Sequence, residues 1–216
     1  MMAGLRELKK EQTRQRICEV ALRLFDERGY EAVTVNEIAE AAGVAKVTLF
    51  NYFPTKECLV LSGIEEDYAR IVTERPPGQS PLDAFRAHYR AMAADDPAEA
   101  DVGALLVRVR VITASPELMA GVHKSHIGQR YALAAALGGS TGDATDDATG
   151  DVTAHLMAAQ ITASITTLQE TFFHRLTSGM PIEEAGRLLA QEVEVAFDLL
   201  EYGFSSKRGE DCEKGN

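Results

Sequence analysis

The stretch TVNEIAEAAGVAKVTLFNYFPTKE, residues Thr34–Glu57, decides the fold of this chain. Thr34 is followed three positions later by Glu37, which is the spacing of a capping box at the start of a helix. Gly43 ends that helix after two turns, because glycine readily adopts the left-handed conformation that a sharp turn needs. A second short helix is expected over 45–52. Two short helices joined by a glycine turn predict a helix-turn-helix.

A longer helix precedes this motif and is expected to complete a three-helix bundle. Its apolar residues recur at the spacing of one helical face, which is made of Ile17, Val20, Ala21, Leu24 and Phe25. Gly29 marks the end of this helix. Ala39 and Ala42 are small enough for close helix approach, while Leu49 and Phe53 can fill the space against the first helix. The last helix of the bundle is then held rigidly, with its other sides free.

Those free sides suit a DNA major groove. They offer a cation, hydroxyl groups and apolar groups, which can meet phosphates, base edges and thymine methyl groups. The residues concerned are Lys46, Val47, Thr48, Phe50, Asn51 and Tyr52. Lys56 lies at the start of the next expected helix, where free backbone N–H groups attract phosphate. The alternative is an ordinary three-helix bundle with no role in DNA binding.

Residues Ala39–Glu57, together with parts of the preceding helix and turn, closely resemble the signature of the TetR (tetracycline-repressor-type) regulators. The resemblance covers about residues 12–62. It implies a repressor that binds a palindromic operator in double-stranded DNA as a homodimer and is released by a small-molecule effector. The chain departs from the family pattern at Phe50, where a tyrosine is usual, and at Ala45, where a serine is common.

The resemblance also assigns roles to individual positions of this chain. It implies that one set of side chains faces the groove: Lys46, Val47, Thr48, Phe50 and Tyr52. It implies that Thr34, Asn36 and Lys56 touch the DNA backbone.

The charge of the chain is unevenly distributed. The net charge is -11, yet residues 1–60 hold nine Lys or Arg and nine Asp or Glu, so all the excess acid lies beyond them. A chain of this kind can use its neutral end on DNA while the acidic body stays away from it. A solvated helix face explains the same charges equally well.

Helical periodicity continues through the rest of the chain. A fourth helix is expected through Val60, Ile64, Tyr68 and Ile71, followed by a proline-rich linker at 75–80. Residues 106–112 alternate like a strand, but a lone strand would have no partner, so a helix is expected there. Further helices are expected at 81–94, 101–113, 115–137, 151–176 and 182–202, with a mobile acidic loop over Gly138–Gly150.

The predicted fold is therefore all-α, with an N-terminal three-helix bundle that contains the helix-turn-helix. The fourth helix joins this bundle to a larger helical domain for ligand binding and dimerisation. The predicted domains are a DNA-binding domain at 1–56, a ligand-binding and dimerisation domain at 57–204, and a disordered tail at 205–216.

Polar side chains in the second domain are candidates for an effector pocket, although a lone His or Arg on a helix is more often solvated. They are His88, Tyr89, Arg108, Arg110, His123, His126 and Gln169. Arg108 and Arg110 point about 200° apart on a helix. We expect one of the two to meet an acidic ligand or a structural carboxylate.

The family resemblance implies that the last two helices pack against those of a second copy. The predicted interface residues are Ile161, Ile165, Phe172, Leu189, Val193 and Phe197. The alternative is a thick core within one chain.

Other functional classes receive no support. Three cysteines do not make a disulfide framework, and His123 with His126 lacks the further ligands of a metal site. No cofactor, metal or catalytic motif is expected, so the protein is predicted not to be an enzyme. With no expected signal peptide or membrane span, a cytoplasmic location follows. The alternatives are a helical small-molecule-binding protein or enzyme that has lost DNA binding, and an adaptor that binds partners through exposed aromatic residues.

Overall fold

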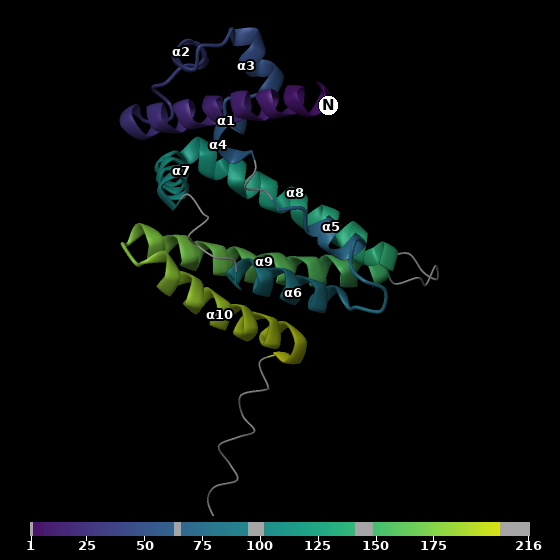
Figure 1. Ribbon diagram of the computed structural model, residues 1–216. Helices are drawn as coiled ribbons and strands as arrows, with labels where there is room; N and C mark the ends of the chain where they lie inside the picture. The colour runs from purple at the N-terminus through teal and green to yellow at the C-terminus, as the bar shows by residue number, and fades with distance from the viewer. Residues whose placement is uncertain (1, 63–65, 95–101, 141–148, 204–216) are drawn as a thin grey trace, which may run out of the picture. The chain divides into compact units, whose positions relative to one another are not determined.

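The computed structural model describes residues 2–62, 66–94, 102–140 and 149–203. Over these residues every regular element is a helix (Figure 1). The all-α prediction is confirmed, including the segment 106–112, which lies within α7 (Val102–Ala114). Within the described ranges no helix is both long enough and apolar enough to cross a membrane.

The chain divides into two compact units, of which the first contains the predicted bundle. This unit comprises Met1–Glu66 and Asp101–Ser125. Its other helices are α1 (Met2–Arg28), α2 (Val35–Ala41), α3 (Lys46–Tyr52), α4 (Cys58–Leu61) and the first turns of α8 (Pro116–Ser140). Figure 1 shows α2 and α3 on one side of α1, with α4 and α7 on the other. The predicted helix-turn-helix is confirmed.

The local signals act as the sequence predicts. Thr34 caps α2, since its hydroxyl accepts the backbone N–H of Glu37 at 3.3 Å and its own N–H donates to the Glu37 carboxylate at 2.8 Å. Gly29 and Gly43 have φ angles of 84° and 65°, so both turns use the left-handed conformation. Leu49 and Phe53 are fully buried in the core of the unit, as expected.

The predicted fourth helix is wrong as a continuous element. Helix α4 ends at Leu61, and Ser62 has an extended backbone with φ -64° and ψ 132°. A separate helix, α5 (Tyr68–Thr73), begins after Asp67, whose carboxylate accepts the N–H of Arg70 at 3.0 Å. Residues 63–65 lie outside the described ranges. The predicted apolar stripe is divided between two hydrophobic cores. Val60 packs in the core of the first unit, whereas Tyr68 packs in a separate core.

The second unit comprises Asp67–Ala100 and His126–Asn216. Its helices are α5, α6 (Pro81–Ala94), the rest of α8, α9 (Thr149–Thr177) and α10 (Ile182–Tyr202). Helix α10 packs against both α6 and α9. The predicted loop over Gly138–Gly150 is too long, since α8 continues to Ser140 and α9 starts at Thr149. The rest of that loop, 141–148, lies outside the described ranges.

The predicted functional boundaries remain predictions. The first compact unit extends beyond residue 56, because α4 and α7 pack against α1. Most of the larger predicted domain forms the second unit. The predicted tail at 205–216 lies outside the described ranges.

Candidate nucleic-acid interface

Helix α3 is anchored by one face and exposes another. Leu49 is buried, and Phe53, the C-cap residue, is buried behind it. On the opposite side Val47 is 72 % exposed and Phe50 is 38 % exposed. The Lys46 ammonium lies 5.9 Å from the centre of the Phe50 ring. A cation and two apolar side chains therefore share an exposed surface on a rigidly held helix.

The remaining residues predicted to face the groove are less exposed. Thr48 and Tyr52 are half-buried, and Tyr52 packs against the core of the first unit. Asn51 is exposed. The exposed surface of α3 is thus centred on Lys46, Val47 and Phe50.

Thr34 and Asn36 lie at the start of α2, where the cap fixes the backbone. The Thr34 hydroxyl also donates to the Glu37 carboxylate at 2.7 Å, and Arg28 pairs with the same carboxylate at 2.8 Å. The hydrogen bonds from Thr34, reinforced by Arg28, lower the pKa of Glu37 to about 2. Asn36 is exposed. The Thr34 hydroxyl, which is predicted to contact the DNA backbone, already forms hydrogen bonds that cap α2.

Lys56 is directed toward its own chain. Its ammonium donates to the backbone carbonyl of Tyr30 at 2.5 Å and lies 4.1 Å from the centre of the Tyr30 ring. The Phe25 ring is 5.5 Å away. Burial lowers the pKa of Lys56. This arrangement ties the start of α4 to the turn after α1. No local motif indicates it, because the partners are 26 positions apart.

Arg14 is a residue that the groove prediction did not include. Its guanidinium lies 5.1 Å from the centre of the Phe53 ring, at the end of α3. A cation of α1 therefore lies beside the helix-turn-helix. Only the fold brings these two residues together.

The two arginines predicted as effector ligands both lie in the first unit and bind other residues of it. Arg110 binds the Asp26 carboxylate through two nitrogens, at 2.9 and 3.2 Å. Arg108 donates to the backbone carbonyl of Ser62 at 3.5 Å. The sequence predicts that one of the two arginines meets either an acidic ligand or a structural carboxylate. Arg110 meets a structural carboxylate, that of Asp26.

The other predicted effector residues are scattered. Tyr89 is buried in the core of the second unit, and the ring of exposed His88 lies 5.3 Å from it. His123 is exposed, whereas His126 and Gln169 are half-buried. In the part of the chain that the structure describes, no three His, Cys, Asp or Glu side chains are grouped to hold a metal ion.

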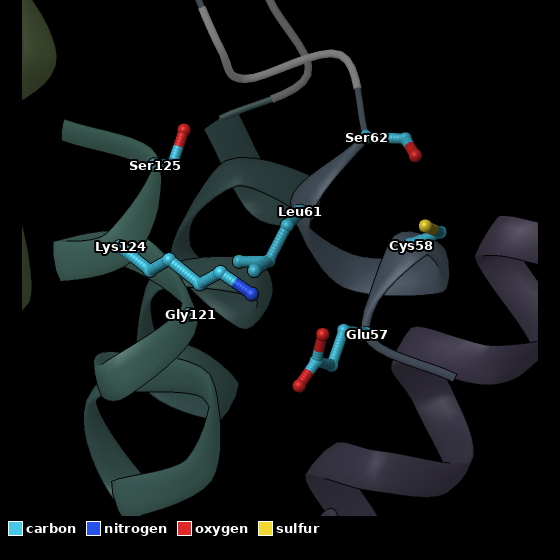
Figure 2. Close-up of a pocket in the computed structure, with 7 residues that line it drawn as sticks. All are labelled: Glu57, Cys58, Leu61, Ser62, Gly121, Lys124 and Ser125. Carbon is cyan, nitrogen blue, oxygen red and sulfur yellow. The ribbon is translucent and has the colours of Figure 1, made fainter. Parts of the chain in front are cut away.

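A pocket of about 320 Å³ lies elsewhere in the first unit (Figure 2). It is lined by Glu57, Cys58, Leu61, Ser62, Gly121, Lys124 and Ser125. None of the seven predicted effector residues lines it. The sequence did not single out these positions, because α4 and α8 are brought together only by folding.

The predicted dimer residues belong to the core of one chain. Ile161, Ile165, Leu189, Val193 and Phe197 are all buried in the second unit, and Phe172 packs against them. The buried five serve the core of the second unit, and their place in a dimer interface stays a prediction.

The fold and the exposed surface of α3 define a helix-turn-helix protein. Within that class, residues 17–62 belong to the TetR family of transcriptional regulators. Residues 17–62 match the family model described as "Bacterial regulatory proteins, tetR family".

Two regulators from other bacteria are similar to part of this chain. The chain is 37 % identical over 124 residues to the HTH-type transcriptional regulator TcmR of Streptomyces glaucescens, covering 54 % of this chain and 55 % of TcmR. It is 40 % identical over 79 residues to the HTH-type transcriptional repressor KstR of Rhodococcus jostii, covering 36 % of this chain and 37 % of KstR. The matched part thus spans about half the length of these relatives, or less.

The whole fold is similar to that of NalD, the secondary repressor of the MexAB-OprM multidrug efflux pump in Pseudomonas aeruginosa. The TM-score is 0.55 at 14 % identity, with 87 % of this chain and 96 % of that chain covered. At this identity the similarity concerns the fold alone.

Proposed function

We propose that the protein is a ligand-responsive transcriptional regulator, acting as a repressor in the cytoplasm. It binds a palindromic operator as a homodimer and is released by a small-molecule effector. The observation that carries this proposal is the exposed surface of α3, where Lys46, Val47 and Phe50 project from a helix anchored by buried Leu49. The family assignment is consistent with this role.

DNA recognition is assigned to α3, which enters the major groove. Lys46 supplies a cation for phosphate or guanine, and Val47 and Phe50 supply apolar contacts for thymine methyl groups. Thr48 and Tyr52, which are half-buried, contribute hydroxyl groups, and Asn36 and Thr34 at the start of α2 approach the DNA backbone. Lys56 acts mainly through Tyr30, since its ammonium already has a carbonyl and a ring as partners.

The homodimer is assigned to the exposed side of α10 and the adjacent side of α9. Val195, Leu199 and Tyr202 follow one another at helical spacing and are all exposed, with Tyr202 at 61 %. On α9, Val152 and Leu156 are also exposed. A second copy that covers this surface buries apolar area that water otherwise contacts. The two-fold symmetry of a dimer matches that of a palindromic operator.

The proposal is tested by binding of the purified full chain to the DNA upstream of its own gene. Fluorescence anisotropy is measured at several fixed salt concentrations, because phosphate contacts make affinity strongly salt-dependent. We expect the upstream duplex to be bound more tightly than an unrelated duplex of equal length. Equal binding of both duplexes at every salt concentration contradicts the proposal.

A further inference from the structure

The pocket beside α4 has the lining of a site for a small polar molecule. Its volume of about 320 Å³ lies at the lower end of the range of small-molecule sites. The lining includes a carboxylate, an ammonium group, a thiol and two hydroxyl groups, with Leu61 as the large apolar side chain. All of these residues belong to the first unit.

Two opposite charges face each other across this pocket. Figure 2 shows the ammonium of Lys124, on α8, and the carboxylate of Glu57, the N-cap residue of α4, both pointing into the open space. Neither side chain takes part in an ion pair among the described residues. A ligand that carries both charges can therefore satisfy both walls at once.

The floor of the pocket depends on a glycine. A Cβ atom added at Gly121 would lie 3.0 Å from Cδ1 of Leu61, which is closer than real Cβ contacts allow without movement. The missing side chain lets α8 approach α4 at this point, while Lys124 and Ser125 border the space one turn further along α8. Leu61 is buried in the core of the unit, so this part of the wall is well supported.

We propose that this pocket binds a small zwitterion, namely an amino acid whose ammonium and carboxylate are separated by a short chain. The ligand's ammonium contacts Glu57 and its carboxylate contacts Lys124. Each contact is a charge-assisted hydrogen bond, which is stronger than a neutral one. A ligand with a single charge satisfies only one wall and is expected to bind more weakly.

The proposed site adjoins the elements that hold the recognition helix. Glu57 follows Lys56, whose ammonium binds the carbonyl of Tyr30, and the next residue, Cys58, begins α4. A ligand that bridges Glu57 and Lys124 fixes the start of α4 relative to α8. The role of this ligand as the effector rests on the proposed function, whereas the binding site itself does not.

Isothermal titration of the full chain without DNA tests the site. The probes are glycine, 3-aminopropanoate, 4-aminobutanoate and 6-aminohexanoate, with butanoate and butylamine as singly charged controls. We expect at least one amino acid to bind with a dissociation constant of about 1 mM or tighter. We expect it to bind about tenfold more tightly than either control.

Matched variants locate the binding. Glu57→Gln and Lys124→Met are each expected to weaken it about tenfold or more, because each removes one charge-assisted contact. Glu40→Gln and Lys10→Met make the same charge changes on exposed residues outside the pocket and should leave it unchanged.

Three results would overturn the site: no binding by any amino acid, equal binding of the singly charged controls, or unchanged binding by both pocket variants. An ion pair between Glu57 and Lys124 that closes the pocket gives the first of these results. Operator affinity is measured separately, with and without the tightest amino acid. Operator binding without amino acid binding rejects the site alone, and the reverse result rejects the regulator alone.

Discussion

Helices α3 and α10 each bury one face and expose apolar side chains on another, but their charges differ. Helix α3 has Lys46 beside its exposed apolar residues and no acidic residue. Helix α10 carries several acidic residues, and Arg86 pairs with three of them, Glu194, Asp198 and Glu201. An exposed apolar surface with a cation suits DNA, whereas one bordered by acidic groups suits another protein chain.

A net charge of -11 is compatible with the proposed DNA binding, because carboxylates of α10 are paired with arginines. The Arg86 side chain is only 13 % exposed, and its carboxylate partners lie along the side of α10 that faces α6. Arg90 also binds Glu194, and Arg175 binds one further carboxylate, that of Glu192. Much of the acid on α10 is thus paired, while Lys46 on α3 forms no ion pair with any residue that the structure describes.

The largest expected effect comes from charging the exposed surface of α10. The double variant V195D/L199D places two carboxylates on the proposed dimer surface, so the dimer should dissociate. Operator affinity should then fall about 100-fold or more, because the second half-site no longer adds to the first. Sedimentation velocity gives the oligomeric state, and anisotropy gives the affinity.

Ile127→Asp is the matched control for this variant. Ile127 is an exposed apolar residue on α8, away from the proposed surface. It should leave both the dimer and the affinity unchanged. If the V195D/L199D protein remains dimeric and keeps its helical circular dichroism, the dimer forms through another surface.

The next largest effect is expected at α3. Phe50→Asp replaces an exposed apolar side chain with a carboxylate that faces DNA phosphates. Operator affinity should fall roughly 10- to 100-fold, while the dimer and the melting temperature stay nearly unchanged. The equivalent change on α2, Asn36→Asp, should cost less, since it affects one backbone contact. If Phe50→Asp binds like the original chain, α3 does not enter the groove in the proposed orientation.

The sequence predicts the helix-turn-helix better than it predicts the role of each face of α10, and the reason is physical. The capping box of Thr34 and Glu37 and the turn at Gly43 act over a few residues, so the helix-turn-helix was predictable. On α10 the apolar stripe predicted as the dimer surface includes Val193 and Phe197, which are buried in the core of the second unit. Burial within one chain and burial between two chains leave the same pattern in a sequence.

Two further differences arise from long-range structure. Val60 and Tyr68 continue one apolar stripe in the sequence, yet they pack into separate cores, so periodicity alone could not reveal the break after Leu61. The pocket residues Glu57 and Lys124 are far apart in the chain, and no local motif joins them. Such sites become visible only when the fold brings the helices together.

A smaller effect separates two lysines that the family resemblance assigns to the same DNA. Lys46→Met should reduce the slope of log affinity against log salt by about 1 for each bound helix, since an exposed cation is lost. Lys56→Met should leave that slope unchanged, because its ammonium is occupied by Tyr30, but should lower the melting temperature. If Lys56→Met reduces the salt slope and leaves the melting temperature unchanged, Lys56 contacts a DNA phosphate instead.

The smallest effect concerns the acid response of the α2 cap. The ordinary pKa of Glu37 is 4.5, and the hydrogen bonds from Thr34 with the Arg28 ion pair lower it to about 2 in the folded chain. A depressed pKa means that the stabilisation by ionised Glu37 is fully present above pH 4.5 and is lost as the pH falls toward 2. Glu37→Gln should therefore lower the melting temperature by a few degrees at pH 7, with a difference from the original chain that shrinks below pH 4.5. The melting temperatures of both proteins, followed by circular dichroism from pH 7 to 3, give this difference directly. The matched variant Glu40→Gln changes a residue of the same helix that takes no part in the cap, and it should show no such pH dependence. If the Glu37→Gln difference in melting temperature is constant with pH, the cap does not depend on the charge of Glu37.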